Sequence, residues 1–232
     1  MATISVKAAD GAGEFSAYVA KPAAEKAGAV VVIQEIFGVN GSLRATCDQL
    51  AAMGFLAVAP DLFWRLEPGV DITDKTDAEW QKAFSLMQAF DQDKGVEDLR
   101  ATLALARALP GGNGRAGAIG FCLGGRLAVM MAERSDADVV VSYYGVGIDG
   151  LMGEIGQVRK PLLLHIAEQD EFVPAAARER VLAAVTGKPG ISAHVYPGVG
   201  HAFARVGGVH YDARAATIAN GRTAETLAAV LG

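Results

Sequence analysis

A cysteine stands between glycines at a point where two apolar segments of the chain meet. Residues 120–125 read GFCLGG. Serine hydrolases place their nucleophile in the same frame, G-x-S-x-G, on a sharp turn between a strand and a helix. The positive end of a helix dipole favours a thiolate there, so Cys122 is a candidate nucleophile. A free cysteine is also often a small core residue, and the motif alone leaves both interpretations open.

Two further stretches carry the partners that such a nucleophile needs. The stretch EQDEFVP follows one predicted strand, and the stretch PGVGHAF follows the next. The order nucleophile, acid, histidine is that of α/β hydrolases. The sequence therefore predicts a triad in which Asp170 orients the imidazole and His201 acts as base and then as acid. Glu168 and Glu171 are alternative acids, although the D-x-x-V-P pattern favours Asp170.

The remaining cysteine and histidines are predicted to be structural. Cys47 lies in the middle of a predicted helix, where a core position is expected. His165 and His194 lie inside strand patterns, and His210 precedes the last helix as an exposed or capping residue. Only His201 combines a glycine-flanked loop with the right place in the order of the triad.

Strands and helices alternate along the chain. Mainly apolar runs predict strands at residues 27–34, 55–59, 114–121, 139–143, 161–167 and 192–196. Helices are predicted at residues 42–53, 77–90, 93–108, 123–134, 175–186 and 212–231. Two alternating runs, 3–7 and 15–20, predict an antiparallel pair at a sheet edge.

This alternation predicts an α/β fold with a mostly parallel central sheet and helices on both faces. No repeat or linker interrupts the sequence, so residues 1–232 are expected to form one α/β-hydrolase domain. In such sheets the active site lies at the carboxyl ends of the strands. All three candidate triad residues follow a strand at that edge.

Composition excludes several classes of function. Half of the residues are hydrophobic (51%), 20% are charged and the net charge is −5, which is typical of a soluble globular protein. No basic stripe indicates nucleic acid, and no apolar run is long enough to span a bilayer. The two cysteines lie far apart in the sequence and in unlike contexts, which argues against a disulfide scaffold and a zinc site. We expect a cytoplasmic monomer without a metal or a cofactor.

Four stretches together resemble the dienelactone hydrolase (carboxymethylenebutenolidase) family of α/β hydrolases. They are QEIFG, GFCLGG, QDEFVP and GVGHAFAR, and the likeness runs from about Val31 to the last helix and includes SYYGVG. The resemblance implies hydrolysis of a small lactone or ester, of the dienelactone-to-maleylacetate type, through a covalent thioacyl-enzyme. It assigns the triad to Cys122, Asp170 and His201.

The resemblance also implies roles outside the triad. Glu35 matches a glutamate that deprotonates the thiol when substrate binds, so that the resting thiol is protected from oxidation. Taken alone, Glu35 could equally be a solvated strand end. The backbone N–H groups of Leu123 and Ile36 match the oxyanion hole, and Leu123 follows the nucleophile as the general motif requires. Arg205 matches an arginine that binds the substrate carboxylate, and Tyr144 matches a residue that lines the site.

The chain departs from the family pattern on the substrate side. Family members that act on dienelactone carry a second arginine on the helix AEWQKAFSLMQAFD, where this chain has Trp80, with Lys82 nearby as a candidate replacement cation. Aromatic positions of that helix are Phe84 and Met87 here, and Ala202 replaces a hydroxyl residue. The residues expected to contact substrate are Arg205, Tyr144, Phe37, Trp80 and Phe84.

These departures predict a pocket that is less cationic and less polar. The alternative function is therefore a related cysteine esterase or lactonase that acts on a less anionic ester. A non-enzymatic thiol sensor on the same fold is a further alternative. An Asp-His pair has no obvious use in a sensor, which disfavours that reading.

Overall fold

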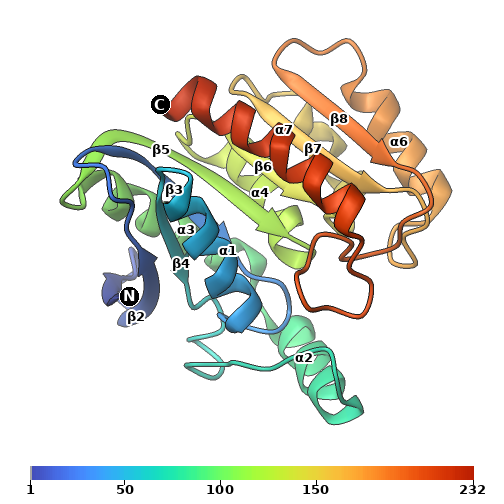
Figure 1. The fold of residues 1–232 in the computed structure, drawn as a ribbon. Coiled ribbons are helices and arrows are strands. Elements are labelled where there is room, and N and C mark those ends of the chain that lie inside the picture. Colours follow the sequence, from blue (N-terminus) through green and yellow to red (C-terminus); the bar gives the residue numbers. More distant parts are fainter. Residues whose placement is uncertain (1) are drawn as a thin grey trace.

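Eight strands form a single sheet in the computed structural model, which describes residues 2–232 (Figure 1). Their order across the sheet is β1-β2-β4-β3-β5-β6-β7-β8. The strands are β1 (Ala2–Lys7), β2 (Glu14–Ala20), β3 (Ala27–Ile33), β4 (Leu56–Pro60), β5 (Gly112–Phe121), β6 (Val140–Tyr143), β7 (Leu162–Ala167) and β8 (Ile191–Tyr196). From β4 to β8 the neighbouring strands run parallel, whereas β1 and β2 form an antiparallel pair and β2 joins β4 in the antiparallel sense. The predicted mostly parallel sheet with an antiparallel edge is confirmed.

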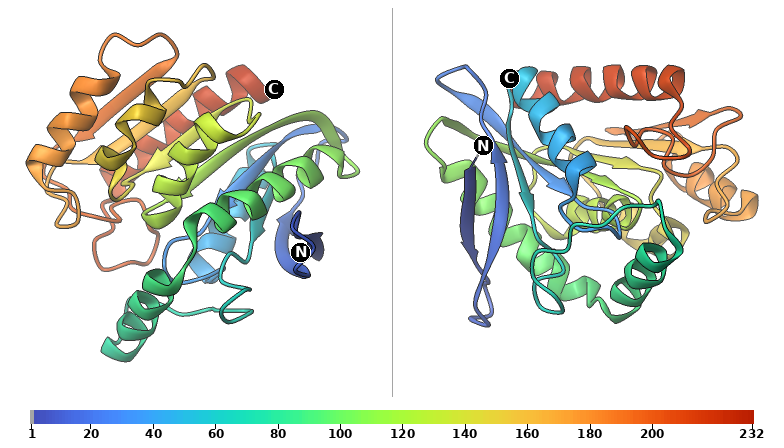
Figure 2. Two further views of the ribbon diagram at one scale, coloured as in Figure 1. Left: turned by 180° about the vertical axis from the view of Figure 1, so that it is seen from behind. Right: turned by 60° about the horizontal axis from the view of Figure 1, so that its bottom comes forward.

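Helices cover both faces of this sheet. They are α1 (Gly41–Ala52), α2 (Asp77–Ala89), α3 (Gln92–Ala108), α4 (Leu123–Arg134), α5 (Met152–Ile155), α6 (Ala175–Val185) and α7 (Ala213–Leu231). Buried residues of α1 and α7 pack on one face, and those of α3, α4, α5 and α6 pack on the other. Figures 1 and 2 show α2 outside both layers, on the side of the molecule where β5 ends.

One segment of regular structure was not predicted. Between β6 and β7 the chain forms a short 3₁₀ helix, η1 (Ile148–Leu151), which continues into the single turn of α5. Elements of four residues are too short to show a helical period in the sequence. The predicted bounds of the other elements differ from the structure by at most two residues at each end.

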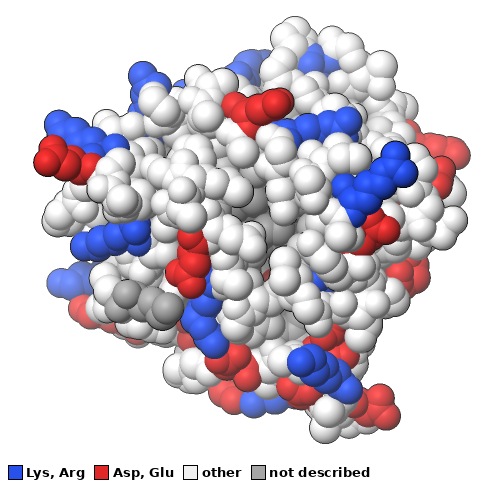
Figure 3. Space-filling model, in the orientation of Figure 1, with Lys and Arg blue, Asp and Glu red and all other residues white. Residues whose placement is uncertain are grey.

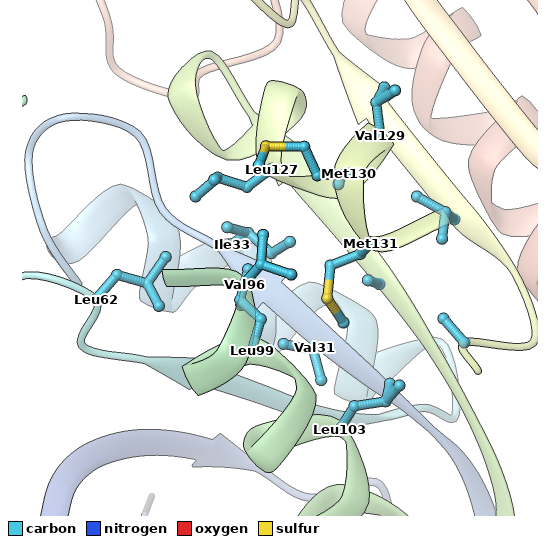
Figure 4. Close-up of a cluster of buried hydrophobic side chains, with 14 of the residues drawn as sticks. Val31, Ile33, Leu62, Val96, Leu99, Leu103, Leu127, Val129, Met130 and Met131 are labelled. Atoms are coloured by element: carbon cyan, nitrogen blue, oxygen red, sulfur yellow. The ribbon is translucent and has the colours of Figure 1, made fainter. Parts of the chain in front are cut away.

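The core is built from strands that are buried on both faces. Every residue of β3 is buried, as the continuous apolar run predicts. Figure 4 shows one side of this core, where Val31 and Ile33 of β3 lie among side chains of α3 and α4. Cys47 of α1 is fully buried on the other face, which confirms its predicted core position.

The surface carries no large patch of one charge on the face that Figure 3 shows. Basic and acidic side chains are interspersed around its rim, and its centre is mostly uncharged. Within residues 2–232, no helix has both the length and the apolar character that crossing a membrane requires.

His165 of β7 is a buried histidine, as its strand position predicts. Its Nδ1 lies 2.8 Å from the Tyr196 hydroxyl, and its Nε2 lies 2.9 Å from the Thr223 hydroxyl. Burial, with smaller contributions from His194 and Arg222, lowers the pKa of His165 to about 3. The folded protein therefore holds this imidazole neutral.

We expect His165 to make the protein less stable in acid. As the pH falls from about 6.5 towards 3, the unfolded chain binds a proton at this imidazole that the folded chain does not, so the free energy of unfolding decreases. Thermal denaturation of the wild type and of His165→Gln at pH 7 and pH 4 checks this. Between pH 7 and pH 4, the Tm of the variant should fall by less than the Tm of the wild type. Equal losses would assign the acid sensitivity to other groups.

Candidate active site

Cys122 lies on a strained turn between β5 and α4. Its backbone has φ 55° and ψ −115°, a conformation that residues with a side chain rarely adopt. A Cβ added to Gly120 would collide with the carbonyl oxygen of Gly124. A Cβ added to Gly124 would lie 2.5 Å from the carbonyl oxygens of Ile33 and Gln34. The glycines of GFCLGG therefore allow the strand, the helix and the neighbouring strand β3 to approach closely around the thiol.

The structure brings Asp170 and His201 together from two loops at the carboxyl ends of β7 and β8. His201 Nδ1 lies 2.8 Å from Asp170 Oδ2, and both side chains are buried. Asp170 Oδ1 accepts a hydrogen bond from the backbone N–H of Phe172. The alternative acids contact backbone instead, since Glu168 accepts from Gly198 N at 2.8 Å and Glu171 approaches His201 N at 3.5 Å. Only Asp170 bonds to the imidazole ring.

The environment of His201 favours its cationic form. Burial alone would lower the pKa of His201, but the nearby Cys122 and the charge and hydrogen bond of Asp170 outweigh it and raise this pKa to about 10. With Nδ1–H directed at Asp170, Nε2 is left without a hydrogen-bond partner among residues 2–232. This nitrogen is free to exchange a proton with a reacting group in the cavity that His201 lines.

A cavity of about 200 Å³ opens above the thiol, and its wall is mostly apolar. Its lining residues are Ile36, Phe37, Trp80, Phe84, Met87, Cys122, Val146, Phe172, His201 and Arg205. The Trp80 ring stacks on Phe84 with centroids 5.4 Å apart, and its edge meets Phe37 at 5.1 Å. The cavity is large enough for a small ring compound and offers it an aromatic surface.

Two lining residues were missed by the sequence analysis. Phe172 sits edge-on to the His201 ring at 4.8 Å, and Val146 follows β6. Both belong to stretches that carry the family resemblance, QDEFVP and SYYGVG. Their place in these stretches could have indicated that both residues lie near the active site.

Of the two residues assigned to the oxyanion hole, Ile36 lines this cavity, and Leu123 directly follows Cys122, which lines it. Leu123 is the first residue of α4, where a helical N–H has no acceptor within its own helix. Ile36 lies in the turn after β3 and lines the cavity together with Cys122. Both positions can supply an amide donor close to the thiol.

Arg205 is held between two carboxylates. Its Nε lies 2.6 Å from Glu35 Oε2 and its Nη1 lies 2.5 Å from Asp74 Oδ2, while its guanidinium stacks 4.9 Å from the Phe37 ring. Burial would lower the pKa of Arg205, but Glu35, Tyr144 and Asp74 together raise it above its usual value. Asp74 was missed by the sequence analysis, because an acid in an irregular loop carries no pattern that marks it.

Glu35, Tyr144 and Lys82 do not line the larger cavity. Glu35 contacts Arg205 and, among the described residues, has no hydrogen bond to Cys122. The Tyr144 ring meets the His201 ring edge-on at 5.1 Å, and Tyr144 lines a separate cavity of about 20 Å³ together with Glu35 and Arg205. Lys82 pairs with Glu67 and does not line the larger cavity, so the expectation that it replaces the missing cation is wrong.

Comparison with known proteins identifies the family. The model of the dienelactone hydrolase family matches residues 15–231. The chain belongs to this family. This dienelactone hydrolase family member is 58% identical over 231 residues to a protein of Azospirillum brasilense named "Putative carboxymethylenebutenolidase", covering 97% of this chain and 96% of the relative. It is 40% identical to the carboxymethylenebutenolidase of Pseudomonas putida, covering 97% and 95% of the two chains.

A solved structure supports the same assignment for the fold. The crystal structure of a "Putative Dienelactone Hydrolase" from Klebsiella pneumoniae superimposes with a TM-score of 0.83 at 25% identity, covering 98% of this chain and 99% of that one. The α/β-hydrolase fold and the family resemblance expected from the sequence are therefore confirmed. The protein is an ester or lactone hydrolase.

Proposed function

We propose that this dienelactone hydrolase family member cleaves a small lactone or ester through a covalent thioacyl-enzyme. The observation that carries the proposal is that a thiol on a strained turn and an imidazole line one cavity, and that a buried carboxylate bonds to the imidazole. The arrangement has the roles of a catalytic triad, with Cys122 as nucleophile, His201 as acid and base, and Asp170 as the orienting acid.

In the first step, the Cys122 thiolate attacks the carbonyl carbon and forms a tetrahedral intermediate. The amides of Leu123 and Ile36 stabilise its oxyanion. The C–O bond of the ester then breaks, and His201 transfers its proton from Nε2 to the leaving oxygen. In a lactone this oxygen stays tethered to the acyl group.

In the second step, a water molecule attacks the thioester while His201 takes one of its protons. The carboxylic acid leaves, and the thiolate and the imidazolium are restored. Because this covalent route supplies its own nucleophile, the proposed reaction needs neither a metal nor an organic cofactor.

Glu35 is proposed to deprotonate the thiol when substrate binds and to return that proton to the thiolate when the product leaves. The Glu35 carboxylate is paired with Arg205 at the border of the site. A movement of the Arg205 side chain on substrate binding would therefore free this carboxylate to accept the proton of the thiol. We expect Glu35→Gln to lower kcat about 10²-fold, the lower range for loss of a general base, because the triad remains but the base is gone. Steady-state turnover and the rate of Cys122 alkylation by iodoacetamide, measured together, check this. Unchanged turnover would show that Glu35 is not the base, and that it only neutralises the charge of Arg205.

Two substrate types fit the proposed chemistry. The names of the relatives refer to a carboxymethylenebutenolide, a lactone that carries a carboxylate. The apolar wall around Trp80 favours a neutral lactone or ester of similar size. Turnover of both kinds by the purified protein, with the Cys122→Ala variant as a blank, tests the proposed function.

A further inference from the structure

Arg205 is the only arginine or lysine lining the catalytic cavity among residues 2–232, and the other cationic group there, His201, is paired with Asp170. A guanidinium offers a carboxylate two edges, one formed by Nε and Nη2 and the other by Nη1 and Nη2. Glu35 lies against the first edge: its Oε2 is 2.6 Å from Nε, and its Oε1 accepts a hydrogen bond from Nη2 at 3.4 Å, whereas the Nε–H itself has no hydrogen-bond partner among residues 2–232. Asp74 lies 2.5 Å from Nη1 and takes part of the second edge. While Glu35 is in place, the two carboxylates block both edges, so a substrate carboxylate cannot take both donors of either one.

The charges around Arg205 also disfavour the binding of a substrate carboxylate. Arg205, Glu35 and Asp74 are each less than a tenth exposed, and two carboxylates facing one guanidinium leave an excess of one negative charge. A further carboxylate entering from the cavity would meet this excess where water screens it poorly. The aromatic wall opposite supplies no compensating cation.

Asp74 is held in place by the structure around it. Its backbone oxygen accepts a hydrogen bond from Trp80 Nε1 at 3.0 Å, and its Oδ2 also faces the backbone N–H of Val209. Two residues earlier, Ile72 is hydrogen-bonded through both its N–H and its carbonyl to the loop after β3, by Phe37 and Asn40. The loop that carries Asp74 is thus fastened on two sides.

This anchoring separates the roles of the two carboxylates. Glu35 must leave Arg205 if it is to deprotonate the thiol, whereas Asp74 remains paired. With Glu35 gone, Asp74 still neutralises the guanidinium. The cavity therefore presents a neutral pair to the substrate rather than a free cation.

We propose that Asp74, acting through Arg205, makes this site selective for neutral lactones and esters over substrates that carry a carboxylate. Asp74 is thus a specificity-determining residue that acts by positioning and neutralising Arg205. The inference rests on the proposed hydrolysis of a small lactone or ester and specifies its substrate class.

A matched pair of substrates tests the selectivity. One is a carboxymethylenebutenolide, and the other is its methyl ester, which has the same lactone ring without the charge. The ratio of the two kcat/KM values for ring opening is measured by ultraviolet absorbance. We expect the wild type to favour the methyl ester about tenfold, and Asp74→Asn to shift the ratio about tenfold towards the carboxylate, as removal of a like charge predicts.

Asp71→Asn is the matched control. Asp71 lies in the same loop but pairs with Arg44 at the surface, with about half of its side chain exposed, so its variant should leave the ratio within about twofold, as for a screened surface pair. A wild type that prefers the carboxylate, or an Asp74→Asn variant with an unmoved ratio, would overturn the inference. If Asp74→Asn does not fold, the wild-type preference and the variant Asp74→Ser decide the question.

Binding separates this inference from the proposed catalysis. In the Cys122→Ala background, calorimetry with benzoate measures access to Arg205 without any turnover. We expect the added Asp74→Asn change to tighten benzoate binding about tenfold and to leave the binding of the neutral benzamide within about twofold. Hydrolysis that survives Cys122→Ala would refute the assignment of Cys122 as the nucleophile. Benzoate binding that is unchanged by Asp74→Asn would refute the role of Asp74 in selectivity.

Discussion

Replacing Cys122 by alanine is expected to lower kcat/KM for lactone and ester hydrolysis on the order of 10⁴-fold or more. The reason is that no other nucleophile lines the cavity in residues 2–232, and water cannot use the acyl-enzyme route. The fold should persist, because alanine removes one atom from a side chain that is already at the cavity and leaves the flanking glycines in place. Steady-state kinetics and circular dichroism measure the two parts of this expectation.

The second cysteine provides the control for Cys122. Cys47 is fully buried in α1, on the face of the sheet that α7 also covers, and burial raises the pKa of its thiol to about 12. Cys47→Ala should therefore keep its turnover within about threefold, since an inert core thiol takes no part in chemistry. Mass spectrometry of the wild type with a slowly deacylating ester should find the acyl group on Cys122. Full activity of Cys122→Ala would refute the thioacyl mechanism.

Asp170→Asn is expected to lower kcat/KM on the order of 10³- to 10⁴-fold, by analogy with the effect of this change in a serine triad. An asparagine at this position donates as well as accepts, so it no longer selects the tautomer with the proton on Nδ1 of His201. The charge that stabilises the imidazolium is lost as well, and the pKa of His201 should fall from its raised value. Activity measured over pH and NMR titration of His201 report the two effects separately.

Glu171→Gln is the matched control for Asp170. Its carboxylate approaches the backbone N–H of His201 at 3.5 Å and does not touch the imidazole. The variant should keep kcat/KM within about threefold and leave the pKa of His201 near its wild-type value, since a long contact to a backbone group contributes little. A larger loss for Glu171→Gln than for Asp170→Asn would transfer the role of the acid to Glu171.

The triad stretches could be located from the sequence because topology does most of the positioning. In a parallel sheet the carboxyl ends of the strands share one edge, so loops that follow β5, β7 and β8 must meet there. The helical period predicted α2, and the family resemblance placed Trp80 and Phe84 of this helix at the substrate site. Trp80, Phe84 and Met87 are spaced by four and three residues, and they line one cavity from one face of α2.

The same period explains why the expectation for Lys82 was wrong. Residues two apart on a helix point to nearly opposite sides, so the helix that turns Trp80 into the cavity turns Lys82 away from it. There Lys82 pairs with Glu67 at the surface. Lys82 is close to Trp80 along the chain, but its side chain does not line the cavity.

Local sequence was thus sufficient for the elements, for the strained turn at Cys122 and for the acid and histidine that follow β7 and β8. These features depend on periodicity, on glycines where a Cβ would collide, and on strand order, all of which short stretches encode. The charge balance at Arg205 depends on something else. Glu35 and Asp74 reach that guanidinium from loops far from it along the chain, and only the packed tertiary structure brings the three charges together. Side-chain pairing across irregular loops has no sequence period, so the charge balance around Arg205 was decided by the tertiary structure.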